Sequence, residues 1–111
     1  MIEKTVLDHL NAALSVKALM EMPHPDRPAF VLIEKSNGSE TEHIYHALIT
    51  IKSYAPSLYQ AALLNEEVKA AMATLIEHDD VAKCQLNSDY PFPDTRLKRP
   101  RYQCVYDIVH Y

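Results

Sequence analysis

The last twelve residues of the chain, 100–111, alternate between apolar and polar positions. Side chains alternate across a strand, so this segment predicts a sheet strand with one apolar face and one mixed face. The apolar face carries Tyr102, Cys104, Tyr106 and Ile108, and the mixed face carries Arg101, Gln103, Val105, Asp107 and Val109. Pro100 suits the first position, where a missing N–H does least harm to the ladder. We therefore expect the C-terminal end to be tied into the core.

Two other segments have apolar residues at the three- and four-residue spacing of an amphipathic helix. The first runs from Ile2 to Leu14, and its narrow apolar stripe predicts a helix that covers one side of a core. The second runs from Ser57 to about Glu77, and Ser57 with Gln60 predicts a capping box at its start. The buried stripe expected on this second helix is Ala61, Leu64, Val68, Ala71, Met72 and Leu75.

Three segments between these helices predict strands. Residues 16–22 indicate a short first strand, which the three prolines of 23–28 end. Residues 29–35 are a β-branched and aromatic run, and Asn37-Gly38 predicts a tight turn because both residues tolerate positive φ. The return strand, 40–52, has two partly apolar faces. We expect it to be central, with helices on one face and a second cover, such as a neighbouring subunit, on the other.

A weaker strand is predicted at 81–88, with Ala82, Cys84 and Leu86 facing inward. We expect Cys84 and Cys104 to be neighbours across an antiparallel pair, both as buried thiols. A loop follows at 89–99, stiffened by two prolines and carrying an exposed Phe92.

The order of elements is helix, strand, hairpin, helix and two strands, within one domain of 111 residues. This order predicts an α+β fold, in which a small antiparallel-rich sheet of four to five strands has two helices packed on one face.

Composition narrows the classes of function. A formal charge of −4 argues against nucleic acid as the main ligand. Apolar runs fall short of the roughly 20 residues that span a bilayer, and the first residues do not resemble a signal peptide, so we expect a cytosolic protein where it is made. The single glycine leaves no Walker or dinucleotide fingerprint.

Candidate chemistry is sparse. His43 and His46 are three residues apart, but in a strand that spacing turns them to opposite sides, and the other histidines are scattered. The acidic pair after His78 falls at a helix end, where solvated charge is common. The one basic cluster consists of Arg96, Lys98, Arg99 and Arg101. It fits two interpretations: a contact with phosphate or an acidic partner, or a solvated loop before a strand. From charge alone, the solvated loop is the favoured interpretation.

Four stretches together resemble the tail terminator proteins (tail completion, or tail-to-head joining proteins) of long-tailed phages and prophages. They are Pro28–Lys35 after a proline-rich entry, Ile49–Ala55 before an alanine-rich helix, the acidic proline loop Asp89–Asp94, and Pro100–Gln103 before the last strand. The resemblance spans nearly the whole chain through short motifs. This chain has Asn37-Gly38 where family members often carry paired glycines, and Tyr54 where they often carry tryptophan.

The resemblance implies a structural virion protein of the tail or neck, made in the host cytoplasm, without catalysis or cofactor and without a membrane. Its implied partners are other copies of itself in a ring, commonly a homohexamer, the tail tube protein, and the head connector or adaptor. DNA would pass through without specific binding, past an assembly whose six copies of −4 sum to −24.

We place the expected interface at Phe92, Arg96, Lys98, Arg99, Arg101 and Asn37, with the aromatic and basic residues contacting a neighbouring subunit or the connector. Three alternatives stay open. The chain could be another phage neck or connector component, a small cytosolic nucleic-acid-binding module that uses the basic cluster, or a small enzyme whose polar residues converge in a pocket.

Overall fold

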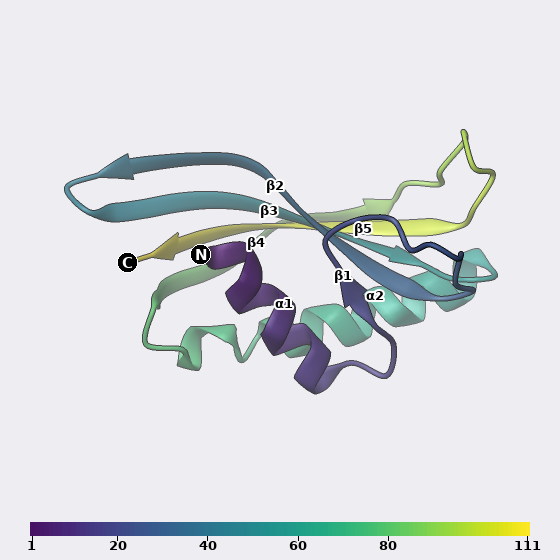
Figure 1. The fold of residues 1–111 in the computed structure, drawn as a ribbon, viewed down its shortest axis with the longest axis horizontal. Coiled ribbons are helices and arrows are strands. Elements are labelled where there is room, and N and C mark those ends of the chain that lie inside the picture. The colour runs from purple at the N-terminus through teal and green to yellow at the C-terminus, as the bar shows by residue number, and fades with distance from the viewer.

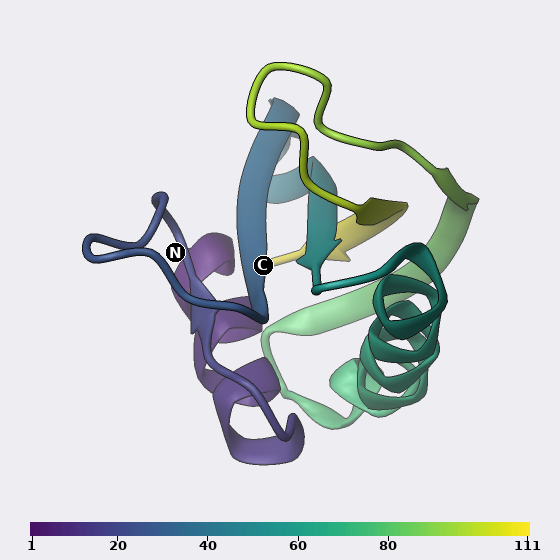
Figure 2. The same ribbon diagram turned by 90° about the vertical axis from the view of Figure 1, so that its right-hand side faces the viewer.

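A mixed sheet of five strands forms the centre of the computed structural model, which describes all 111 residues. The elements in chain order are α1 (Ile2–Ala13), β1 (Ala18–Leu19), β2 (Phe30–Thr41), β3 (Ile44–Tyr54), α2 (Leu58–Met72), the 3₁₀ helix η1 (Leu75–Glu77), β4 (Val81–Pro91) and β5 (Arg101–His110). The strand order is β1-β2-β3-β5-β4; β1 pairs parallel to β2, and every other pair is antiparallel. Both α-helices lie on one face (Figures 1 and 2), which confirms the predicted α+β fold.

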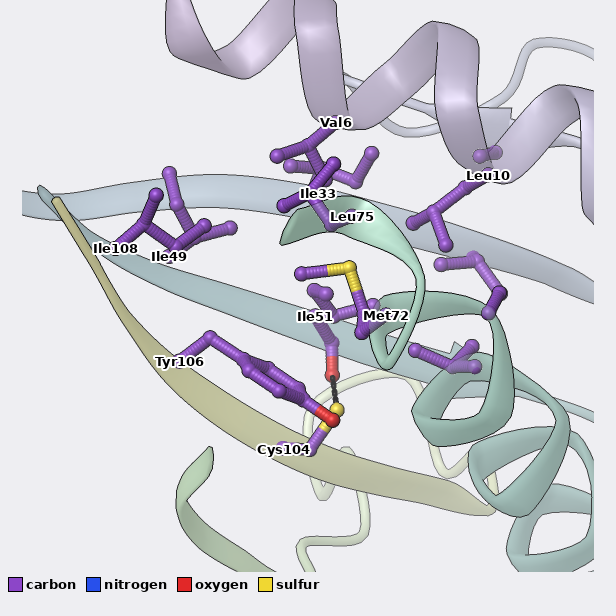
Figure 3. Close-up of a cluster of buried hydrophobic side chains, with 14 of the residues drawn as sticks. Val6, Leu10, Ile33, Ile49, Ile51, Met72, Leu75, Cys104, Tyr106 and Ile108 are labelled. Carbon is purple, nitrogen blue, oxygen red and sulfur yellow. Dashed lines mark hydrogen bonds between the residues drawn. The ribbon is translucent and has the colours of Figure 1, made fainter. Parts of the chain in front are cut away.

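The main core lies between this helix-covered face and the two helices. From α1, Ile2, Val6 and Leu10 are buried, as the stripe predicts. All six stripe residues expected on the second helix are buried too. Figure 3 shows Met72 and Leu75 pointing at Ile51 and Ile33 of the sheet. The apolar spacing therefore identified the inward side of both helices.

The last strand and the central strand are also as predicted. Strand β5 holds Cys104, Tyr106 and Ile108 in the core, and β3 is the third of five strands, with β2 and β5 on its two sides. Its residues Ala47, Ile49 and Ile51 face the helices. Tyr45, at the outer end of the same face, is exposed.

The hairpin turn between β2 and β3 lies at Glu42-His43, so the prediction of a turn at Asn37-Gly38 is wrong. Glu42 and His43 have φ of 52° and 66°, whereas Gly38 has no positive φ. A turn at Asn37-Gly38 would set polar residues 42–43 against the apolar half of β2. The observed register instead sets Ile33 opposite Ile51. Burial of apolar side chains outweighs the local turn preference of one dipeptide.

Two other boundaries differ from expectation. The first strand is only Ala18–Leu19, because the chain leaves β2 after two paired residues. Helix α2 ends at Met72, short of Glu77. The Ala71 carbonyl accepts from the Thr74 N–H, the Thr74 hydroxyl and the His9 ring instead of an N–H four residues on, and the next turn is 3₁₀.

Strand β4 does not follow the predicted inward pattern. Ala82 and Leu86 are exposed, because register shifts at Val81/Lys83 and Leu86/Ser88 break the alternation of side chains. Cys84 does face the core, and both cysteines are free thiols. They are not neighbours across the pair, however, since Cys84 lies opposite Ile108 and Cys104 lies opposite Asp89.

No helix of this structure is both long enough and apolar enough to cross a membrane.

Candidate functional site

Arg101, the last residue of the basic cluster, is an interior residue. Its guanidinium donates through Nε to the Phe92 carbonyl oxygen at 2.7 Å and through Nη1 to the Tyr54 hydroxyl at 2.9 Å. The carboxylate of Asp94 lies 3.4 Å from the same Nη1. The Arg101 side chain is 11% exposed. It therefore ties the loop of residues 92–100 to the sheet and is not free to meet a partner.

Arg99 is also engaged within the chain. It forms an ion pair with Asp26 at 2.7 Å and donates to the carbonyl oxygens of Arg27 and Pro28. Its guanidinium lies 5.2 Å from the centroid of the Phe30 ring. This one side chain joins the proline-rich segment after β1 to the loop before β5, which are about 70 residues apart in sequence.

These two arginines are stacked with aromatic rings on the sheet face opposite the helices. The rings of Phe30 and Tyr54 are 4.6 Å apart and nearly parallel, and both arginines lie within 5.5 Å of the Tyr54 ring. Arg101 also lies 4.7 Å from the Phe92 ring. At this end of the sheet, the chain's own loop supplies the second cover that the sequence left open (Figure 2).

Elsewhere the second face is closed by polar side chains that bond to one another. The hydroxyls of Ser36 and Thr50 are 2.7 Å apart, and Gln103 donates to the Tyr90 hydroxyl at 2.6 Å. Thr50 and Gln103 are both buried. Near the β2–β3 turn, this face has a hollow of about 170 Å³ beside Leu48.

Asn37, the remaining predicted interface residue, is exposed at the rim of this hollow. Its side-chain oxygen accepts the N–H of Gly38 at 2.8 Å. It lies at the opposite end of the sheet from Phe92, so the structure does not bring the six predicted interface residues into one surface.

What remains exposed of the basic cluster is Arg96 and Lys98, together with Phe92, which is 45% exposed. Arg27, missed by the sequence analysis, is exposed in the proline-rich segment, and its carbonyl oxygen accepts from Arg99 of the same cluster. The chain's six salt bridges involve none of these three cations. We refer to this surface, Arg27 with Phe92–Lys98, as the basic end.

The opposite end carries a set of unpaired acids that the sequence analysis also missed. The hairpin tip holds Glu40 and Glu42, Glu77 is the last residue of η1, and the turn between η1 and β4 holds Asp79 and Asp80. All five are exposed and belong to no salt bridge. The signal was hard to find in the sequence, because the two segments are more than 30 residues apart. We refer to these five residues as the acidic end.

Both edges of the sheet are open over most of their length. Beyond Leu32, β2 has β3 on one side and no strand on the other, because β1 stops after two residues. On the opposite edge, the whole of β4 pairs only with β5. Asn65 and Lys69 of α2 contact the Asp89 side chain, which ties the helix to β4 without blocking the edge of its backbone.

The groups with potential chemistry are separate from one another. No three His, Cys, Asp or Glu side chains are arranged to hold a metal ion. The His9 ring nitrogen Nε2 contacts the Ala71 carbonyl oxygen at 2.8 Å, and His78 packs edge-on against the same ring. Burial raises the pKa of the Cys84 thiol to about 11 and that of Cys104 to about 12, so neither is poised as a nucleophile at neutral pH.

No protein-family profile matches this chain, and no curated protein matches it.

Proposed function

We propose that this chain is a structural subunit of a ring, of the kind that tail terminator proteins of long-tailed phages form to cap the tail tube and join it to the head. The observation that carries the proposal is the pair of open sheet edges, β2 beyond Leu32 and β4. Unpaired backbone donors and acceptors along a strand are a template for pairing with another chain.

The directions of the two edges suit copies that share one orientation. Strand β2 runs parallel to β5, since both are antiparallel to β3, and β4 runs antiparallel to β5. Strand β4 of one copy would therefore meet β2 of the next copy antiparallel, and the alternation of the sheet would continue across the contact. Such a contact between two different edges is heterologous, and it closes into a ring when the rotation between copies allows.

The bulges limit where an added strand can pair. On β4, the register shifts divide the edge into two regular stretches, Lys83–Leu86 and Ser88–Pro91, and on β2 the shift after Lys35 separates Asn37–Thr41 from the stretch that ends at Lys35. Bulges on exposed edges oppose uncontrolled sheet growth. Short regular stretches between bulges favour a defined register between neighbours. The exposed Asn37 of the expected interface lies within the β2 stretch.

The contacts that Arg99 and Arg101 of the basic cluster make within the chain also support a structural role. Arg99 and Arg101 hold the loop before β5 in place through ion pairs, carbonyl contacts and ring stacking. A loop fixed in this way loses little conformational entropy when a partner docks on it. Such fixed surfaces suit a part that joins two larger assemblies.

The test is the mass of the purified protein in solution by light scattering, with rings checked by electron microscopy. Six chains of 12.7 kDa give a ring of roughly 76 kDa. Leu86→Lys places a charge on the exposed β4 edge and should abolish the ring. The matched control is Leu63→Lys on α2, which is similarly exposed and away from both edges, and should leave the ring intact.

A wild-type protein that stays monomeric at high concentration would contradict the proposal, as would equal loss of the ring in both variants. Tight binding of free DNA that weakens steeply with salt would favour the nucleic-acid-binding alternative instead.

A further inference from the structure

The molecule has opposite charge at the two ends of its longest axis, which measures 43 Å. In Figure 1 the β2–β3 turn and the C-terminus are at one end, and the loop before β5 is at the other. The acidic end has five unpaired carboxylates, and the basic end has Arg27, Arg96 and Lys98. A surface of this kind steers copies toward an end-to-end approach in which the acidic end of one meets the basic end of another.

The acidic end includes a protruding element. The β2–β3 hairpin extends past the rest of the sheet, and its turn is the outermost point in Figure 1. All residues from Glu34 to His46 are exposed. The tip carries the carboxylates of Glu40 and Glu42, followed by Ile44, which is 40% exposed. The tip therefore combines negative charge with two exposed apolar side chains, Ile44 and the adjacent Tyr45.

The basic end includes a hollow of matching character. A shallow groove of about 440 Å³ lies between the start of α2 and the loop before β5. Leu58, Pro93, Thr95 and Pro100 line it, with Lys98 and Arg99 at its side. The carboxylate of Asp94 also belongs to the lining and is paired with Arg101. The helix start adds positive potential, since Ser57 caps the N–H of Gln60 and leaves those of Leu58 and Tyr59 without helical acceptors.

We propose that the hairpin tip of one copy binds the groove at the basic end of a second copy. Ile44 meets the apolar wall at Leu58, and Glu40 and Glu42 meet Lys98 and Arg96. The tip and the groove are complementary in charge, and each is exposed in the single chain. The contact is heterologous, so it can join more than two copies.

The contact is distinct from the strand-edge contact proposed for the ring, because it uses the ends of the molecule and not its edges. In the Leu86→Lys background, edge pairing is blocked and end-to-end association is measured alone. A failure of one proposal therefore leaves the other standing.

Two charge-reversed chains test the contact. Arg96→Glu/Lys98→Glu makes both ends acidic, and Glu40→Lys/Glu42→Lys gives the tip positive charge. Each alone should weaken self-association at least about tenfold in sedimentation velocity at low salt, and a one-to-one mixture should recover it to within about threefold of the parent. Parent association should fall as salt rises from about 50 to about 500 mM.

The matched control, Glu77→Lys/Asp79→Lys, makes the same change of charge at the acidic end but off the hairpin, and should weaken association less than about threefold. Equal loss in the control and the tip variant would overturn insertion of the tip. The proposal also fails if the mixture does not recover association, or if the parent is monomeric at low salt.

Discussion

Arg101 and Tyr54 form a buried hydrogen bond, in which the guanidinium Nη1 donates to the phenol oxygen at 2.9 Å. The same guanidinium holds the Phe92 carbonyl and Asp94. Arg101→Met would keep most of the side-chain volume but leave these acceptors without their partner. We expect a loss of about 2–4 kcal/mol in the free energy of unfolding, measured by urea denaturation.

Arg96 supplies the control for this measurement, because it belongs to the same basic cluster but is exposed and unpaired. Arg96→Met should change stability by less than about 0.5 kcal/mol. Similar losses in the two variants would show that Arg101 does not hold the loop.

Asp94 should make the stability of the loop depend on pH. The N–H of Leu97 donates to its carboxylate, and the nearby Arg101 charge adds to the effect, so the pKa of Asp94 lies below its ordinary value. A carboxyl with a depressed pKa in the folded state stabilises the fold above its unfolded pKa of about 3.9, and this contribution is lost as pH falls through the folded pKa. Asp94→Asn should therefore be less stable than wild type at pH 7, and the gap should shrink below about pH 4. A gap of the same size at pH 3 would contradict this origin.

The turn at Glu42-His43 should be improvable. Both residues hold positive φ, which costs side chains with a Cβ more than asparagine or glycine. Glu42→Asn/His43→Gly should raise the free energy of unfolding by about 0.5–1 kcal/mol, since Asn-Gly is the preferred pair for this turn. Thermal unfolding in high salt would measure this without interference from association. A destabilised variant would mean that the Glu42 and His43 side chains contribute more than their backbone strain costs.

The two thiols should differ in reactivity. Cys104 is fully buried, whereas Cys84 is half-buried on the edge strand. Burial favours the neutral thiol of Cys104, and the raised pKa of this group leaves little thiolate at pH 8. We expect a disulfide reagent to modify Cys84 slowly and Cys104 only after unfolding in urea, as followed by mass spectrometry. Modification of Cys104 first would contradict its placement.

The elements with strong apolar spacing were predictable from sequence. The stripe from Ala61 to Leu75 and the alternation from Tyr102 to Ile108 each follow from one local period, and burial of the apolar side decides the orientation. Burial of apolar side chains also explains why the turn prediction at Asn37-Gly38 was wrong. The local turn preference competes with a strand register that is set by distant residues such as Ile51.

The candidate surfaces could not be found in this way. Arg99 pairs with Asp26, which is 73 residues away in the sequence. No local pattern shows that a charged loop residue is engaged in contacts within the chain. The acidic end likewise combines the hairpin tip with Glu77 of η1 and the turn that follows, and the course of β3 and α2 brings these segments to the same end. The bulges of β4 depend on its pairing with β5 and leave no sequence period of their own.

Asn11 of α1 occupies both backbone groups of Ala18: its side-chain oxygen accepts the N–H at 2.9 Å, and its amide donates to the carbonyl at 3.1 Å. The outer side of β1 is therefore already satisfied by a side chain. A strand added to this edge can reach only the part of β2 beyond Leu32. Asn11 and β1 together thus confine any added strand to that part of β2, and in the proposed edge pairing they would limit how far neighbouring copies can shift along their strands.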